Sequence, residues 1–189
     1  MSATTALVTA EEYSRMHFDV PTELVRGEIV FPCGDDGMTR PGFRHGGVCV
    51  NVSALLRNWT KVSKAGRVAS NDSWISTRRD PDSVRGADVA YIRIERLPDG
   101  RVPDGPTDLV PDLCVEVVSP SNTVKEMRDK ADEYLVAGVE EMWIVDPRKC
   151  SVLVLRRDAV PRVVSDQDVL STPVLPGFSA KVSEFFEDL

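Results

Sequence analysis

Two acidic side chains stand inside apolar segments of the sequence. Glu116 lies between two valines in the run 112–118, where an unpaired carboxylate would be costly to bury. Asp88 stands near the start of a second such run, residues 87–92. If these runs form neighbouring strands, their carboxylates can share a hard cation, because oxygen ligands suit Mg²⁺ and Mn²⁺. Asp88 and Glu116 are therefore candidate metal ligands.

Lys130 is the candidate cationic side chain beside these acids. On a helix over residues 124–135 it lies next to Met127 and Tyr134, at the edge of the apolar face. Its flexible side chain can extend over the sheet toward Glu116. Spacing alone leaves two interpretations open: a metal site built from three residues, and a lysine that only extends from an amphipathic helix to solvent.

Short apolar segments separated by turn residues must position these side chains. Helical periodicity and alternation predict the elements that follow. The predicted helices cover residues 9–16, 48–62 and 124–135, with a short one from 182, and the predicted strands cover 22–25, 28–31, 67–70, 74–77, 87–94, 112–118, 141–145, 152–155 and 162–164. Residues 33–47, rich in Gly, Pro and Asp, predict a mobile loop. Two apolar strands joined through a helix predict an α/β sheet with helices covering it.

The composition is that of a globular chain with an acidic excess. The 189 residues include 30 acidic and 23 basic side chains, a formal charge of −7. The length predicts a single domain over residues 1–189. The acidic charge argues against a protein that coats nucleic acid non-specifically and against one that lies on an anionic membrane. Because the sequence has neither a signal-peptide pattern nor a long apolar run, we expect a cytoplasmic protein with no membrane contact.

Several common site motifs are missing from the sequence. There is no GxGxxG, GxxxxGK[ST] or G-x-S-x-G pattern, which argues against dinucleotide-binding, P-loop and serine-hydrolase sites. The four cysteines form no CxxC pair, and with only two histidines a closed zinc site is not expected. We expect reduced thiols, with Cys114 buried in a strand.

Several segments together resemble the Uma-type restriction endonucleases, a branch of the PD-(D/E)XK nuclease superfamily. The matching segments are ELVRGEI at 23–29, GADVAY at 86–91, DLCVEVVSPS at 112–121, MRDK at 127–130 with Tyr134, AGVEEMWIVDP at 137–147 and LPGF at 175–178. The resemblance covers roughly residues 9–186. It implies a restriction-endonuclease-like core of about residues 42–147, with an α-β-β-β-α-β order, a mixed sheet flanked by helices, and extra hairpin strands at both ends.

The resemblance also implies roles for individual residues. Asp88 and Glu116 would bind a divalent metal, Mg²⁺ or Mn²⁺, with the Val117 carbonyl as a further ligand. The lysine usual two residues after the second acid is absent, since position 118 is valine, and Lys130 on the following helix would replace it. Two smaller departures are Ala87 in place of a proline and Glu126 in place of an aspartate. Neither removes a catalytic group.

The implied activity is metal-assisted hydrolysis of DNA phosphodiester bonds, an endonuclease reaction. Two alternatives stay open. One is a nuclease fold kept as a binding or regulatory module with weak or no catalysis, and the other is a structural ion-pair network. For Glu23 and Glu28 we expect that one or both are solvated hairpin charges, with approach to the site as the alternative. For His45 we expect a loop or capping role rather than contact with a phosphate.

The acidic charge limits how tightly DNA can be held. We expect weak, strongly salt-sensitive DNA binding at a local basic rim. The candidate rims are Arg78, Arg79 and Arg85, and separately Arg156, Arg157 and Arg162, with a solvated surface as the alternative for both groups. A homodimer is expected, because cutting both strands with one small domain needs two sites.

Overall fold

A single large sheet organises the molecule. The structure is a computed structural model, and it describes residues 6–31, 42–120 and 122–189. Its sheet has eight strands in the order β2-β1-β4-β5-β6-β7-β8, with β3 paired to β4 outside this path. The strands are β1 (Glu23–Val25), β2 (Glu28–Val30), β3 (Gly66–Arg78), β4 (Ser83–Arg93), β5 (Leu113–Val117), β6 (Glu141–Asp146), β7 (Ser151–Arg156) and β8 (Arg162–Ser165). Among these strands only β5 and β6 pair in parallel, so the sheet is mixed.

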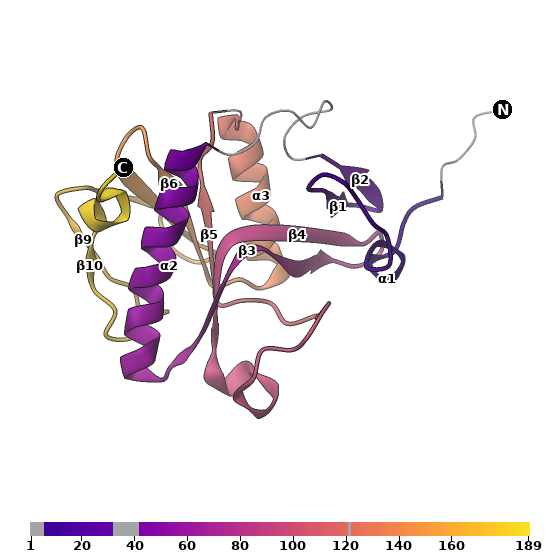
Figure 1. Cartoon of the computed structure of the whole chain (residues 1–189), viewed down its shortest axis with the longest axis horizontal. Coiled ribbons are helices and arrows are strands. Elements are labelled where there is room, and N and C mark those ends of the chain that lie inside the picture. The colour runs from indigo at the N-terminus through magenta and orange to yellow at the C-terminus, as the bar shows by residue number, and fades with distance from the viewer. Residues whose placement is uncertain (1–5, 32–41, 121) are drawn as a thin grey trace.

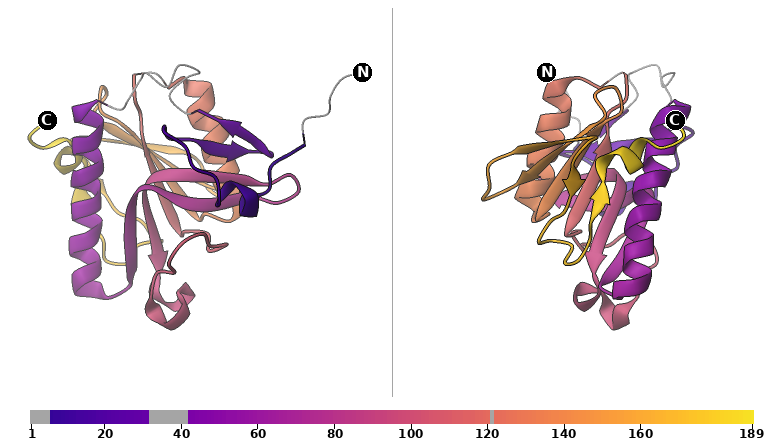
Figure 2. Two further views of the ribbon diagram at one scale, coloured as in Figure 1. Left: turned by 45° about the vertical axis from the view of Figure 1, so that its right-hand side comes forward. Right: turned by 90° about the vertical axis from the view of Figure 1, so that its left-hand side faces the viewer.

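Two helices cover opposite faces of this sheet: α2 (Phe43–Ser63) and α3 (Val124–Ala137) (Figure 1; Figure 2, right). Alternation along β5 divides its side chains between them. Val115 packs in one core with Val52 of α2, and Cys114 packs in the other with Ala131 of α3. The observed order α2-β3-β4-β5-α3-β6 confirms the predicted α-β-β-β-α-β core, and Cys114 is buried as predicted.

Strand β3 is one long bent strand where the sequence predicted two short ones. Its pairing with β4 shifts between Ser70 and Ser73, so that Asn71 and Asp72 together lie opposite Asp88. Both inserted residues have positive φ, 69° and 52°, a conformation that Asn and Asp tolerate better than most side chains. This β-bulge bends β3 beside Asp88. Bulges are common next to functional sites, where they redirect a side chain.

Helix α2 begins earlier than the sequence predicted. Residues 43–47 were expected to belong to a mobile loop, but the helix starts at Phe43, after an extended Gly42. Tertiary contact explains the difference: a Cβ at Gly47 would lie 2.2 Å from Cδ2 of Leu189, so the small residue allows the C-terminal segment to pack there. The rest of the predicted loop lies outside the described residues.

The two ends of the chain extend the core. Helix α1 (Ala10–Tyr13), shorter than the predicted 9–16, begins with a capping box in which Thr9 accepts from the Glu12 amide at 3.1 Å. The predicted hairpins are present as β1–β2 and β7–β8. A small sheet of β9 (Val169–Leu170) and β10 (Ala180–Lys181) was not predicted, and the expected C-terminal helix is a 3₁₀ turn, η3 (Val182–Phe186). No helix in the described part of the chain is long and apolar enough to cross a membrane.

Candidate active site

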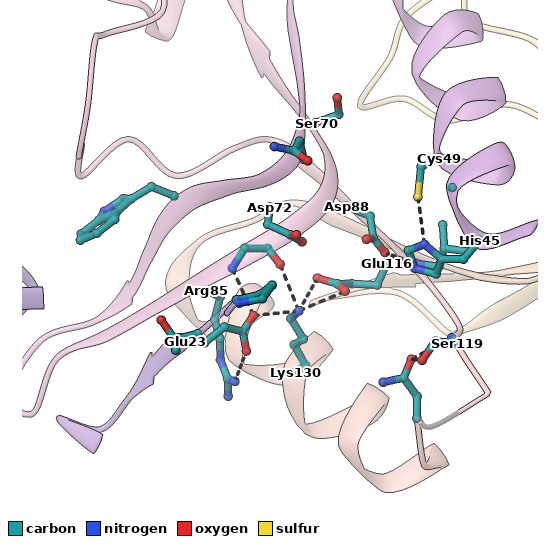
Figure 3. A pocket seen from close by; sticks show the side chains of 18 of the residues that line it. Glu23, His45, Cys49, Ser70, Asp72, Arg85, Asp88, Glu116, Ser119 and Lys130 are labelled. Atoms are coloured by element: carbon teal, nitrogen blue, oxygen red, sulfur yellow. Dashed lines mark hydrogen bonds and ion pairs between the residues drawn. The ribbon is translucent and has the colours of Figure 1, made fainter. Parts of the chain in front are cut away.

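A cavity of about 630 Å³ opens beside the bulge of β3. Its walls come from the N-terminal part of α2, the bulge, the middle of β4, the end of β5 and one face of α3. Among the residues that line it are His45, Cys49, Asp72, Asp88, Glu116 and Lys130. Figure 3 shows the carboxylates of Asp72, Asp88 and Glu116 pointing toward one another inside it. The fold therefore brings all three predicted catalytic residues to one place.

The backbone of β5 orients Asp88. Its Oδ2 accepts a hydrogen bond of 2.7 Å from the Val117 amide, just past the point where the pairing of β4 with β5 ends at Val89 and Val115. The same oxygen lies 3.4 Å from Nε2 of His45. Asp88 is thus held by neighbouring groups and does not move freely in the cavity.

Glu116 is buried at the floor of the cavity. Its residue exposure is 6%, and its carboxylate accepts a 3.1 Å hydrogen bond from the Tyr134 hydroxyl. Lys130 Nζ lies 3.0 Å from its Oε1. Burial raises the pKa of Glu116 to about 8; Lys130 opposes this rise, and the nearby carboxylates of Asp88 and Glu23 add to it. The site thus holds more negative charge than its own lysine compensates.

Lys130 joins three parts of the site. Its ammonium lies 3.0 Å from Oε1 of Glu116, 3.0 Å from Oε1 of Glu23 and 3.0 Å from the carbonyl oxygen of Gly86. Burial by itself would lower the pKa of Lys130, but the two carboxylates outweigh it and raise this pKa, so the side chain is a cation. Helix α3 places the lysine here because its N-terminus is fixed by a capping box, in which Glu126 accepts from the Thr123 amide at 2.8 Å. Glu126, which stands where the family pattern has an aspartate, therefore still caps the start of the helix.

Of the two hairpin acids, Glu23 is the one that lies in this site, so only Glu28 is the solvated hairpin charge that we expected. Its residue exposure is 8%, and it accepts hydrogen bonds from Arg85 at 2.8 Å and from the Gly86 amide at 3.2 Å. Burial would raise the pKa of Glu23, but Lys130 and Arg85 lower it below its usual value. Glu28, on the other strand of the hairpin, is exposed as expected.

His45 also lies in the cavity wall, so the loop or capping role expected for it is wrong. It stands in the first turns of α2, with Nε2 toward Asp88 and Nδ1 3.6 Å from Cys49 Sγ. Burial would lower the pKa of His45, but hydrogen bonds with Asp88 and Cys49 outweigh it and raise this pKa to about 10. The spacing of His45 and Cys49, one helical turn apart, would have indicated a shared face if the helix start had been predicted.

Two of the three arginines of the first predicted basic rim are paired with acids, and the third, Arg78, is exposed. Arg85 is buried in ion pairs with Glu23 and Glu133, at 2.8 and 2.6 Å. Arg79 pairs with Asp82 and Asp108. Of the second group, Arg157 and Arg162 donate to backbone carbonyls of the chain itself, and none of its three arginines lines the cavity. The positive charge near the site is therefore mostly compensated.

Three carboxylates in the cavity are of the ligand type that a hard divalent cation prefers, although their oxygens are not gathered within 4.8 Å of one another as the ligand atoms of His45, Cys49 and Asp88 are. Asp72, Asp88 and Glu116 offer carboxylate oxygens, and Val117 lines the same cavity. Asp72 is a residue that sequence analysis missed. The pKa of its carboxyl is raised by burial and by the neighbouring Asp88. A bound cation would balance this concentration of negative charge.

The core order and the acids at neighbouring strands are those of a restriction-endonuclease-like fold. The family model Uma2, described as putative restriction endonuclease, matches residues 10–183, and the chain belongs to this family. A crystal structure of a putative nuclease belonging to DUF820 from Anabaena variabilis is similar to this chain with a TM-score of 0.76 at 17% identity, covering 95% of this chain and 97% of that one. This likeness confirms the fold. No curated protein matches the chain.

Proposed function

We propose that this protein is a metal-dependent endonuclease that hydrolyses DNA phosphodiester bonds. The observation that carries the proposal is the ion pair between Lys130 Nζ and Glu116 Oε1. The two atoms lie 3.0 Å apart in the cavity that Asp88 also lines. A buried cation beside a concentration of carboxylates is an arrangement suited to a negatively charged transition state. Membership of the Uma2 family supports nucleic acid as the substrate.

In this proposal Asp88 and Glu116 hold Mg²⁺ or Mn²⁺, and the Val117 carbonyl is a further ligand. When bound, such a cation polarises the scissile phosphate and lowers the pKa of a water molecule. The Val117 amide keeps the Asp88 carboxylate in place, since it donates to Oδ2 at 2.7 Å. Tyr134 holds one oxygen of Glu116 in the same way, at 3.1 Å.

Lys130 acts as a fixed positive charge in this mechanism. Because its pKa is raised, it does not serve as a general base. Its ammonium instead orients the attacking water or stabilises the charge that develops on the phosphate oxygens. Glu23 keeps the ammonium over Glu116, at 3.0 Å from its own Oε1. No side chain of the site needs to become covalently attached to the substrate.

DNA binding by this site is weak and salt-sensitive in our proposal. The chain has a formal charge of −7, and Arg85 and Arg79 already pair with acidic side chains. Arg85 and Lys130, which line the cavity, both face carboxylates, so the site itself offers the phosphate backbone little free positive charge. We further propose a homodimer, because cleavage of both strands needs two such sites.

The test is cleavage of supercoiled plasmid, single-stranded DNA and branched DNA with Mg²⁺, Mn²⁺ or EDTA. The variants are Asp88→Ala and Lys130→Ala, with Asp129→Ala and Lys125→Ala as controls, since that second pair forms an exposed ion pair on the same helix. We expect metal-dependent nicking that only the first two variants lose. Equal activity of the wild type and Asp88→Ala would reject the proposal.

A second candidate function is a nuclease fold that binds nucleic acid without cutting it. The ion pairs of Lys130 with Glu23 and Glu116 favour it, because they already balance charge in the cavity without a bound metal. It predicts binding of DNA in a gel-shift assay with no cleavage under any metal. A third, a purely structural ion-pair network, predicts no Mn²⁺ binding that depends on Asp88 and Glu116.

A further inference from the structure

A second set of metal-binding side chains borders the carboxylates. His45, Cys49 and Asp88 each offer one ligand atom, and these three atoms all lie within 4.8 Å of one another. His45 and Cys49 come from successive turns of α2, and Asp88 comes from β4. In Figure 3 the sulfur of Cys49 points to the His45 ring, and that ring points to Asp88.

The ligand types in this set differ from those expected to hold Mg²⁺. A thiolate and an imidazole prefer softer cations, Zn²⁺ above all, whereas carboxylate oxygens alone prefer Mg²⁺ or Mn²⁺. Zn²⁺ is bound in proteins by Cys sulfur, His nitrogen and carboxylate oxygen, and sites with three protein ligands keep a water in the fourth position. The expectation against a closed zinc site concerned four protein ligands, and it does not exclude this open set of three.

The geometry needs only small side-chain movements to close around an ion. Nδ1 of His45 lies 3.6 Å from Cys49 Sγ, and Nε2 lies 3.4 Å from Asp88 Oδ2. Each of the three residues is at least partly buried and lines the cavity, so an ion can enter from solvent and the ligands are not free to move apart. As the ion binds, the Cys49 thiol and the His45 imidazolium each release one proton to solvent, because a metal ligand must be a thiolate or a neutral imidazole.

We propose that His45, Cys49 and Asp88 form a site for a thiophilic divalent cation, Zn²⁺, and that occupancy of this site displaces the hard cation from Asp88. Asp88 is common to both ligand sets, and its Oδ2 lies beside both His45 Nε2 and the Val117 amide. A carboxylate can bridge two cations, but the Asp88 oxygen that faces His45 also accepts from the Val117 amide, so this proposal makes binding of the two cations competitive. This second part rests on the proposed function, because it makes Zn²⁺ an inhibitor of the nuclease.

The direct test uses Co²⁺ as a spectroscopic substitute for Zn²⁺. A thiolate bound to Co²⁺ gives an intense near-ultraviolet charge-transfer band, which Zn²⁺ removes when it replaces Co²⁺. We expect this band in the wild type and in Cys150→Ser, whose thiol contacts Pro147 and does not line the cavity. We expect no band in Cys49→Ser and Zn²⁺ binding at least about 100-fold weaker in both Cys49→Ser and His45→Ala. Circular dichroism confirms that each variant is folded.

Competition is followed through the electron paramagnetic resonance signal of Mn²⁺. Zn²⁺ is expected to release bound Mn²⁺ from the wild type at low concentration, and to need about 100-fold more in Cys49→Ser. A band that persists in Cys49→Ser, or no band in the wild type, overturns the zinc site. Simultaneous binding of Zn²⁺ and Mn²⁺ overturns the shared use of Asp88. A wild type that shows the Cys49-dependent band and cuts no DNA refutes the proposed nuclease and leaves the zinc site standing.

Discussion

The ammonium of Lys130 lies 3.0 Å from Oε1 of Glu116, an ion pair that joins α3 to β5 at the floor of the cavity. Neither group is stable there alone, because a buried charge without a partner costs several kcal/mol. The pair thus fixes the position of α3 relative to the sheet. It also concentrates opposite charges at the place where we propose catalysis.

Replacing Lys130 tests both roles of this pair. In Lys130→Met the apolar stem is kept and the charge is lost, so Glu116 and Glu23 become uncompensated. We expect cleavage to fall by about 100-fold or more and the free energy of unfolding to fall by about 3–5 kcal/mol. Plasmid cleavage and urea denaturation measure the two effects. Lys125→Met, which removes an exposed charge of the same helix, should change neither, and a similar loss in both variants would contradict a specific role for Lys130.

Glu23 is predicted to be a positioning residue that acts through Lys130. Glu23→Gln keeps the shape and an oxygen acceptor but removes the charge that faces Lys130 and Arg85. We expect kcat to fall about 10-fold with little change in KM, and stability to fall by about 1–3 kcal/mol. Glu28→Gln is the matched control, because Glu28 is exposed on the same hairpin. If Glu23→Gln loses stability while kcat is unchanged, Glu23 has only a structural role.

The raised pKa of Glu116 predicts how stability depends on pH. The unfolded chain releases this proton near the usual value of 4.5, and the folded protein holds it until about 8. Stability from this group is therefore complete below the lower value and is lost as the pH rises through the upper one. In EDTA, the stability of Glu116→Gln relative to the wild type should rise by about 2–5 kcal/mol between about pH 5 and pH 9. Urea unfolding at several pH values measures this difference, and parallel curves would show that Glu116 titrates normally.

Gly86 allows the bulge to lie against β4. A Cβ at this position would lie 2.9 Å from the Cα and 2.9 Å from the carbonyl oxygen of Asp72, so the backbone of the bulge would have to move. We expect Gly86→Ala to cost about 1–3 kcal/mol of stability and to weaken Mn²⁺ binding. Gly46→Ala is the control for stability, because a Cβ there meets nothing within 4 Å. Unchanged Mn²⁺ affinity in Gly86→Ala would mean that the bulge does not shape the metal site.

Local patterns in the sequence pointed to three residues that the structure brings into one cavity. Asp88 and Glu116 could be found because they interrupt apolar strands, and Lys130 because it lies at the edge of an amphipathic face. Those signals need only a few neighbouring residues. They also sufficed for the core order of helices and strands, since each of these elements carries its own periodicity.

Long-range packing explains what sequence analysis missed. Glu23 is buried only because the hairpin that holds it packs beside β4, where Arg85 and Lys130 meet its carboxylate. His45 stands in a part of α2 whose glycines are typical of a loop. The contact between Leu189 and Gly47, which favours a helix there, is not visible in the local sequence. No local pattern contains those contacts. Asp72 did have a signal, because Asn71 and Asp72 are turn-forming residues between two strand-like segments.

The most direct test of metal-dependent cleavage at Asp88 is single-turnover plasmid cleavage by Asp88→Asn. Asparagine keeps an oxygen acceptor for the Val117 amide, so this variant should fold normally while it loses the charge that binds the metal. We expect Mg²⁺-dependent nicking by the wild type and by Asp129→Asn, and no nicking by any of the proteins in EDTA. The rate for Asp88→Asn should be at least about 100-fold lower. A folded Asp88→Asn that cuts at the wild-type rate would contradict metal-dependent cleavage at Asp88.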